Sequence, residues 1–113
     1  MPDPMDVIDR QVFTELQDAV GADFVAELVG TFFEEAPTLL AGMREAVSDG
    51  SDVDFRRAAH SLKTNAQTFG AKVLSEQART LELGGLPVDP VALDTVDAAY
   101  AAAAAALEAI RHG

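Results

Sequence analysis

One histidine stands out in residues 58–71, whose sequence reads AAHSLKTNAQTFGA. If this segment is helical, His60, Lys63 and Gln67 fall on one side of it. A neutral imidazole nitrogen is nucleophilic near pH 7, and a cation and an amide beside it suit a bound anion. A phosphoryl group is such an anion. The pattern therefore suits a phosphoryl group on His60, with Lys63 supplying charge and Gln67 supplying a hydrogen bond.

Other chemistries fit the same residues less well. A general-base histidine needs a carboxylate to orient its ring, and Asp54 falls on another face of the helix, so we expect only basic or neutral neighbours. A metal-binding pair is excluded because Arg56 and Thr64 occupy the positions one turn from His60. The chain has no cysteine, so no zinc site is expected. No glycine-rich phosphate loop or nucleophile–base pair appears, which argues against an enzyme with its own turnover.

Helices must position these residues, because strand patterns are nearly absent. A first helix is predicted from a cap at Asp6, through Val7 and Ile8, to Gly21. A second begins near Asp23 and continues through Pro37 as one kinked helix, because its apolar stripe keeps phase across the proline. The stripe is spaced by three and four residues: Val25, Leu28, Phe32, Ala36, Leu39, Met43 and Val47.

The helix that carries His60 is predicted to start at a capping box formed by Ser51 and Asp54. Its apolar face is spaced by four and three residues: Phe55, Ala59, Leu62, Ala66 and Phe69. His60 points about 140° away from the centre of that face, so we expect it to be exposed. Gly70 is predicted to have a structural role, ending or bending the helix.

Two further helices complete the predicted fold. One runs to the stop at Gly84 and Gly85, and the last begins at Asp89 and Pro90, a cap followed by proline at the first helical position. Short connections favour antiparallel neighbours. The sequence therefore predicts a single all-α domain over residues 1–113, an antiparallel up-down four-helix bundle with a short extra N-terminal helix.

The composition narrows the choice of partners. Nineteen acidic residues against eight basic ones give a net charge of −11, which argues against nucleic acid and anionic membrane surfaces. The N-terminus lacks the apolar run of a signal peptide, and no window approaches the apolar length expected of a membrane span. We therefore expect a cytoplasmic protein, or a cytoplasmic domain of a longer one such as a hybrid kinase, and we expect it to be monomeric.

The stretch AHSLKTNAQTFGAKVLSEQARTLE resembles the histidine phosphotransfer (Hpt) domain, whose motif reads roughly H-x-L-K-G-S-x-x-x-x-G-A. His60, Leu62, Lys63, Gly70 and Ala71 match that motif. The resemblance implies a helical bundle that passes a phosphoryl group between receiver-domain aspartates in a multistep phosphorelay. It implies a response-regulator receiver domain and a sensor or hybrid histidine kinase as partners. It also places the Mg²⁺ used in transfer in the receiver, with no cofactor bound by this chain.

The sequence departs from the motif at Thr64, where the family usually has glycine. Thr64 lies about 40° from His60 around the helix, so we expect it to narrow a partner's approach. This departure keeps open an alternative, an Hpt-like adaptor that docks a response regulator without carrying phosphate.

The predicted docking surface is a small apolar patch beside His60, with Arg56, Arg57 and Lys63 giving local positive charge. Phe32 and Phe33 are adjacent, so both cannot lie at the centre of one buried stripe. Phe33 is the candidate for the patch.

Overall fold

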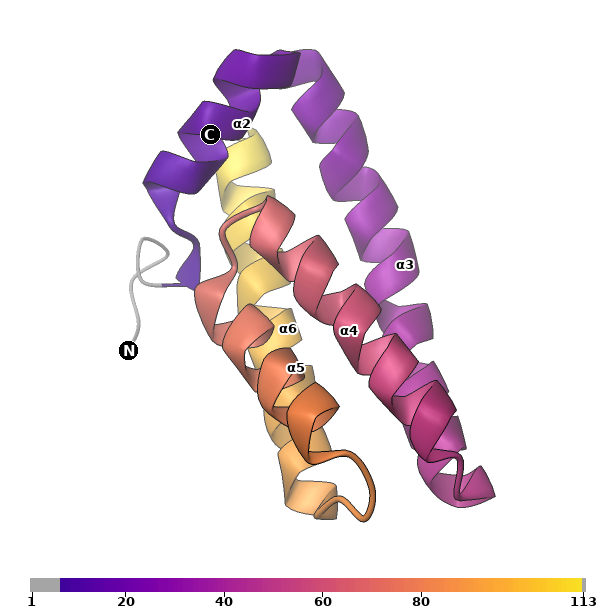
Figure 1. The fold of residues 1–113 in the computed structure, drawn as a ribbon. Helices are drawn as coiled ribbons and strands as arrows, with labels where there is room; N and C mark the ends of the chain where they lie inside the picture. Colours follow the sequence, from indigo (N-terminus) through magenta and orange to yellow (C-terminus); the bar gives the residue numbers. More distant parts are fainter. Residues whose placement is uncertain (1–6, 113) are drawn as a thin grey trace.

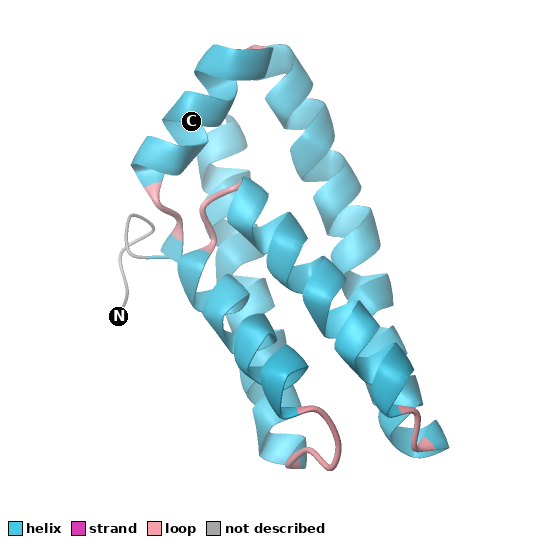
Figure 2. Cartoon of the chain, in the orientation of Figure 1, coloured by secondary structure: helices cyan, strands magenta, loops and turns pink. Residues whose placement is uncertain are grey.

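The described part of the chain is helical throughout its regular structure. This computed structural model describes residues 7–112, with side chains as far as Ile110. The helices are α2 Arg10–Val20, α3 Ala22–Asp49, α4 Asp52–Thr68, α5 Lys72–Gly84 and α6 Pro90–His112. The described residues contain no strand, and short loops join the helices (Figure 2). The predicted all-α class is confirmed.

Four long helices form the bundle. Each of α3, α4 and α5 contacts the next helix along the chain, and α6 returns to contact α3 and close the ring. In Figure 1 these helices run side by side, while α2 lies over one end and leads into α3. The short loops make successive helices antiparallel. The up-down four-helix bundle with an extra N-terminal helix is therefore as predicted.

The predicted helix through Val7 and Ile8 to Gly21 is interrupted, because Val7 is helical but Ile8 and Asp9 are not. Asp6, the predicted cap, lies outside the described residues. The helix α2 begins at Arg10, and its cap is Asp9, whose carboxylate accepts hydrogen bonds from the backbone N–H groups of Gln11 (3.0 Å) and Val12 (3.4 Å). Ile8 precedes this cap and is fully buried, so it joins the core from outside α2.

Helix α3 continues through Pro37 without a break, as the unbroken stripe predicted. Its buried face differs from the predicted one, because the buried positions are Val25, Val29, Phe32, Ala36, Leu40, Met43 and Ala46. These advance about 3.5 residues per step, the period of helices that pack side by side along their length. The prediction took the neighbouring residue at three of the seven positions, where Leu28 and Leu39 are only half-buried and Val47 is exposed.

The predicted apolar face of α4 is confirmed at all five positions, which are buried: Phe55, Ala59, Leu62, Ala66 and Phe69. Ser51 caps the helix by accepting a hydrogen bond from the backbone N–H of Asp54 at 3.3 Å. The backbone N–H of Ser51 donates instead to the carbonyl of Ala46, at 2.9 Å. Half of the predicted capping box therefore forms.

Helix α6 begins as predicted, with the Asp89 carboxylate accepting from the backbone N–H of Val91 at 2.9 Å. Contrary to expectation, Pro90–Ile110 is long and apolar enough to cross a membrane, and among the described helices it alone passes that test. Alanines provide much of this apolar character. A core helix of a bundle has the same composition, and α6 buries Leu93, Val96 and Leu107 among its neighbours. The test is therefore weak evidence for a membrane span.

Candidate functional site

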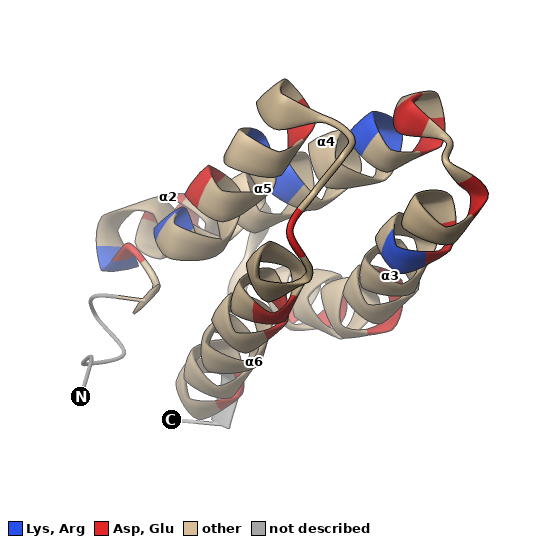
Figure 3. Cartoon of the chain, turned by 90° about the horizontal axis from the view of Figure 1, so that it is seen from below, with Lys and Arg blue, Asp and Glu red and all other residues tan. Residues whose placement is uncertain are grey.

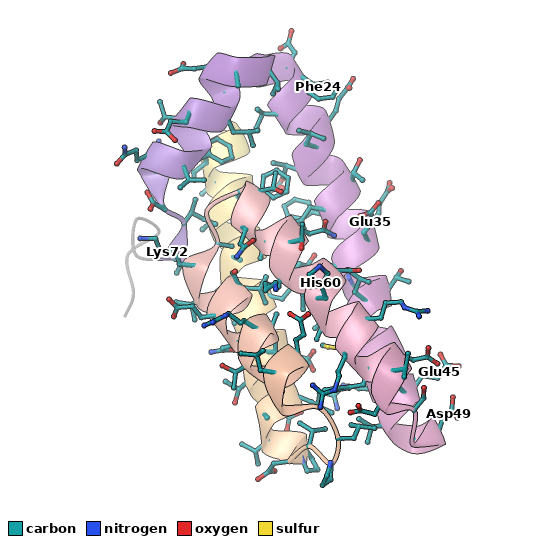
Figure 4. All side chains as sticks on the ribbon, in the orientation of Figure 1. Phe24, Glu35, Glu45, Asp49, His60 and Lys72 are labelled. Atoms are coloured by element: carbon teal, nitrogen blue, oxygen red, sulfur yellow. The ribbon has the colours of Figure 1, made fainter. Side chains whose placement is uncertain are left out.

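His60 lies midway along α4, on the face that turns away from the core. The side chain is 56% exposed, and Figure 4 shows it on the open side of α4. Its neighbours Ala59 and Leu62 are fully buried, which anchors the helix on the opposite side. The predicted exposure of His60 is confirmed.

A carboxylate from the next helix holds both His60 and Lys63. The Oε2 atom of Glu82, on α5, lies 2.7 Å from Nδ1 of His60, and its Oε1 atom accepts a hydrogen bond from Nζ of Lys63 at 2.8 Å. We call these three side chains the bridge. The expectation that only basic or neutral groups surround His60 is wrong, because it considered α4 alone. Antiparallel helices bring together residues at similar distances from the turn, and His60 and Glu82 lie nearly symmetrically about Gly70. That symmetry could have revealed Glu82.

The bridge fixes the charge of Glu82. The hydrogen bond from Lys63 lowers the pKa of this carboxyl below its ordinary value, and His60 lowers it further, while partial burial opposes both. The carboxylate is therefore ionised at neutral pH. Because the pKa of Glu82 is lower in the folded state than in the unfolded state, the bridge stabilises the fold at pH values above the ordinary carboxyl pKa. This stability is lost as the pH falls through the folded-state pKa of Glu82.

An ionised carboxylate can only accept hydrogen bonds, so the proton between Glu82 and His60 belongs to Nδ1. In a neutral ring Nε2 then keeps its lone pair, and Nε2 belongs to a side chain that is more than half exposed. The arrangement presents a nucleophilic nitrogen to solvent, with an ammonium group one turn away. Such an arrangement suits nucleophilic attack on an anionic group.

Residues 27–111 match the family model of the Hpt domain. This chain belongs to the Hpt domain family. It is 38% identical over 66 residues to histidine-containing phosphotransfer protein 2 of Arabidopsis thaliana, covering 53% of this chain and 42% of that protein. It is 29% identical over 77 residues to phosphorelay protein LuxU of Vibrio harveyi, covering 68% of each. No solved structure matches. The family and the names of these relatives support the prediction that this chain is a histidine phosphotransfer module of a multistep phosphorelay.

The Hpt domain keeps Gln67 apart from the bridge. Gln67 is exposed about 10 Å further along α4 than His60, and it lines a cavity with residues of α2 and α5 that include Val12 and Ser75. The structure thus brings together two of the three residues predicted to act on phosphate. The role of Gln67 stays a prediction.

The two arginines of α4 differ in their surroundings. Arg56 donates from Nε to Asp52 at 2.8 Å, and from Nη1 to the carbonyls of Glu82 (2.9 Å) and Leu83 (3.2 Å). Arg57 is exposed, and no other described residue forms a hydrogen bond or ion pair with its side chain. The chain has only eight basic residues against nineteen acidic ones, and Figure 3 shows basic residues on α4, so Arg57 is one of few cations open to a partner.

Thr64 lies on the exposed face beside His60, as predicted. Its hydroxyl donates to the carbonyl of His60 at 3.1 Å. This bond folds the hydroxyl back onto the helix, one turn from the imidazole. Where the family motif has glycine, this Hpt domain therefore carries a branched side chain next to His60.

Phe33 is half-buried rather than open, and its ring packs 6.4 Å from that of the core residue Phe32. Helical geometry places it about 160° around α3 from Glu35. Glu35 lines a groove between α3 and α4, together with Leu39 and Asn65. The structure therefore does not place Phe33 in this groove, which lies beside the helix that carries His60. Its role in partner binding stays a prediction, and Leu39 is the half-buried apolar residue that sequence reasoning missed there.

The turn after the histidine helix leaves no space for a side chain at Gly70. Its φ is +77°, and a Cβ atom there would lie 2.8 Å from the carbonyl oxygen of Asp9. The backbone N–H of Asp9 donates to the carbonyl of Gly70 at 2.7 Å. This close approach ties the start of α2 to the turn between α4 and α5.

Proposed function

We propose that His60 is the phosphoryl carrier of this Hpt domain, taking the group from one receiver-domain aspartate and passing it to another. One observation carries the proposal. The exposed imidazole is held at Nδ1 by an ionised carboxylate, Glu82, which also holds the ammonium group of Lys63 beside it.

The chemistry follows from that geometry. Nε2 of His60 attacks the phosphorus of an aspartyl phosphate, so that an N–P bond forms and the P–O bond to the aspartate breaks. The aspartate leaves as a carboxylate. The ring keeps its Nδ1 proton and gains positive charge, which the Glu82 carboxylate stabilises through the existing hydrogen bond. The reverse step, with the aspartate carboxylate as nucleophile, returns the neutral imidazole.

The proposal extends to the partners. The receiver domain of a response regulator and a sensor or hybrid histidine kinase would exchange phosphate with His60. The Mg²⁺ for transfer would be bound by the receiver, and nucleic acid and membrane would play no part. The domain would act as a monomeric cytoplasmic carrier without turnover of its own, because phosphate must be supplied and removed by other proteins.

A transfer experiment tests the proposal. The chain is incubated with Mg²⁺ and a phosphorylated receiver domain, and the acid-labile phosphate is mapped by mass spectrometry under neutral conditions. We expect it on His60, with nuclear magnetic resonance placing it on Nε2. Phosphate on another residue would overturn the assignment. Receiver binding without any transfer would instead establish the docking adaptor.

The side chain of Thr64 allows a prediction about partner approach. Thr64→Gly is expected to speed transfer from a generic receiver, because it clears the exposed face beside His60. It should cost up to about 0.5 kcal/mol of helix stability. The checks are the transfer rate at fixed receiver concentration and the thermal midpoint. An unchanged or slower rate would mean that Thr64 does not obstruct the partner.

A further inference from the structure

The guanidinium of Arg56 is directed at the end of α5. Its Nη1 donates to the carbonyls of Glu82 and Leu83, which belong to the last turn of α5 and have no partner within that helix. A cation at this position also opposes the negative end of the helix dipole. Arg56 therefore caps α5 from the neighbouring helix.

Asp52 completes the contact between the two helices. One carboxylate oxygen accepts from Nε of Arg56 at 2.8 Å, and the other accepts from the backbone N–H of Leu86 at 2.7 Å. Gly85 lies between these groups with φ +62°, and a Cβ atom there would overlap the guanidinium and the Asp52 carboxylate. We call Asp52 and Arg56, with the backbone they bind at residues 82–86, the interhelix clamp.

The clamp and the phosphate-accepting site meet in one residue. The backbone carbonyl of Glu82 is bound by Arg56, and its side-chain carboxylate is bound by His60 and Lys63. Arg56 lies one turn before His60 on α4. A shift of the end of α5 along α4 would therefore move the Glu82 carboxylate away from Nδ1 of His60, and the clamp opposes that shift.

We propose that Arg56, with Asp52, is a positioning residue for phosphoryl transfer, acting through Glu82 to hold the His60 imidazole. This rests on the proposed function of His60. It also gives Arg56 a different task from that of Arg57. The sequence predicted that both arginines attract the partner, whereas three hydrogen bonds within the domain already occupy the guanidinium of Arg56.

The test compares Arg56→Met with wild type by two measurements. Long-range ¹⁵N–¹H spectra of His60 report which ring nitrogen carries the proton, and we expect the variant to lose the single Nδ1–H form. Transfer from a phosphorylated receiver is measured across receiver concentrations. We expect the limiting rate to fall roughly fivefold while the half-saturating concentration stays unchanged, because the reacting groups are misplaced and docking is not weakened.

Two further variants separate positioning from simple attraction. Arg56→Lys keeps the charge but lacks the planar fork that reaches a carboxylate and two carbonyls together, so it should behave like Arg56→Met. Asp52→Asn is a milder change that removes a negative charge. Attraction predicts tighter receiver binding for it, whereas positioning predicts an altered His60 spectrum and a lower limiting rate. Arg57→Met, the contrast, should raise the half-saturating concentration and leave the His60 spectrum as in wild type.

Several outcomes would overturn the proposal. They are a wild-type His60 spectrum in both Arg56→Met and Asp52→Asn, full rescue by Arg56→Lys, or an effect of Arg56→Met confined to the half-saturating concentration. Spectra are recorded well below the thermal midpoint of each variant, so a destabilised fold is recognised separately. If wild type takes no phosphate on His60, the proposed function fails, but the imidazole spectra still decide whether Arg56 positions Glu82.

Discussion

His60→Gln is expected to abolish phosphate acceptance while leaving the helical fold intact. The variant removes the nucleophilic nitrogen but keeps an amide that can donate to the Glu82 carboxylate. Because the side chain is 56% exposed, the stability change should stay within about 0.5 kcal/mol. The measurements are phosphate incorporation from a phosphorylated receiver, circular dichroism and the thermal midpoint.

The control for this variant is His112→Gln, which replaces the other histidine of the chain and should take phosphate like wild type. Phosphate retained by His60→Gln would contradict the assignment of the carrier. Loss of phosphate together with loss of helical signal would show a folding defect, and His60→Ala would then be compared at lower temperature.

Lys63→Ala is expected to slow transfer by raising the activation barrier by roughly 1–2 kcal/mol, on the premise that the ammonium group contacts the phosphoryl group. The structure gives this variant two effects. It removes a cation that lies beside His60, and it leaves the Glu82 carboxylate without the partner now 2.8 Å away. The uncompensated negative charge would repel phosphate. The measurement is the limiting transfer rate, and Lys63→Arg should keep part of it.

A double-variant cycle separates these two effects. Glu82→Gln removes the negative charge and keeps a side chain able to hydrogen-bond to His60. If Lys63 serves only to neutralise Glu82, Lys63→Ala should have no effect in the Glu82→Gln background. If Lys63 also contacts the phosphoryl group, part of the slowing should remain there. Equal rates for Lys63→Ala and wild type would leave Lys63 without a role in transfer.

The sequence by itself determined the helices and the exposure of His60. Stripes spaced by three and four residues and strong end signals, such as Ser51 and the Asp89–Pro90 pair, are local features that the chain alone specifies. For the same reason the burial of the α4 face could be predicted at every position. The break in the first predicted helix at Ile8 and Asp9 was missed, because the chain continues its helical pattern there and Asp6 and Asp9 are both suitable caps.

Only the tertiary structure decided what surrounds His60. Glu82 lies 22 residues further along the chain, and it reaches Nδ1 because α4 and α5 pack antiparallel about the turn at Gly70. The same packing turns Arg56 from an apparent surface cation into a cap on α5. A helical wheel shows which residues share a face of one helix. It carries no information about the neighbouring helix, whose position depends on how the buried faces of all the helices fit together.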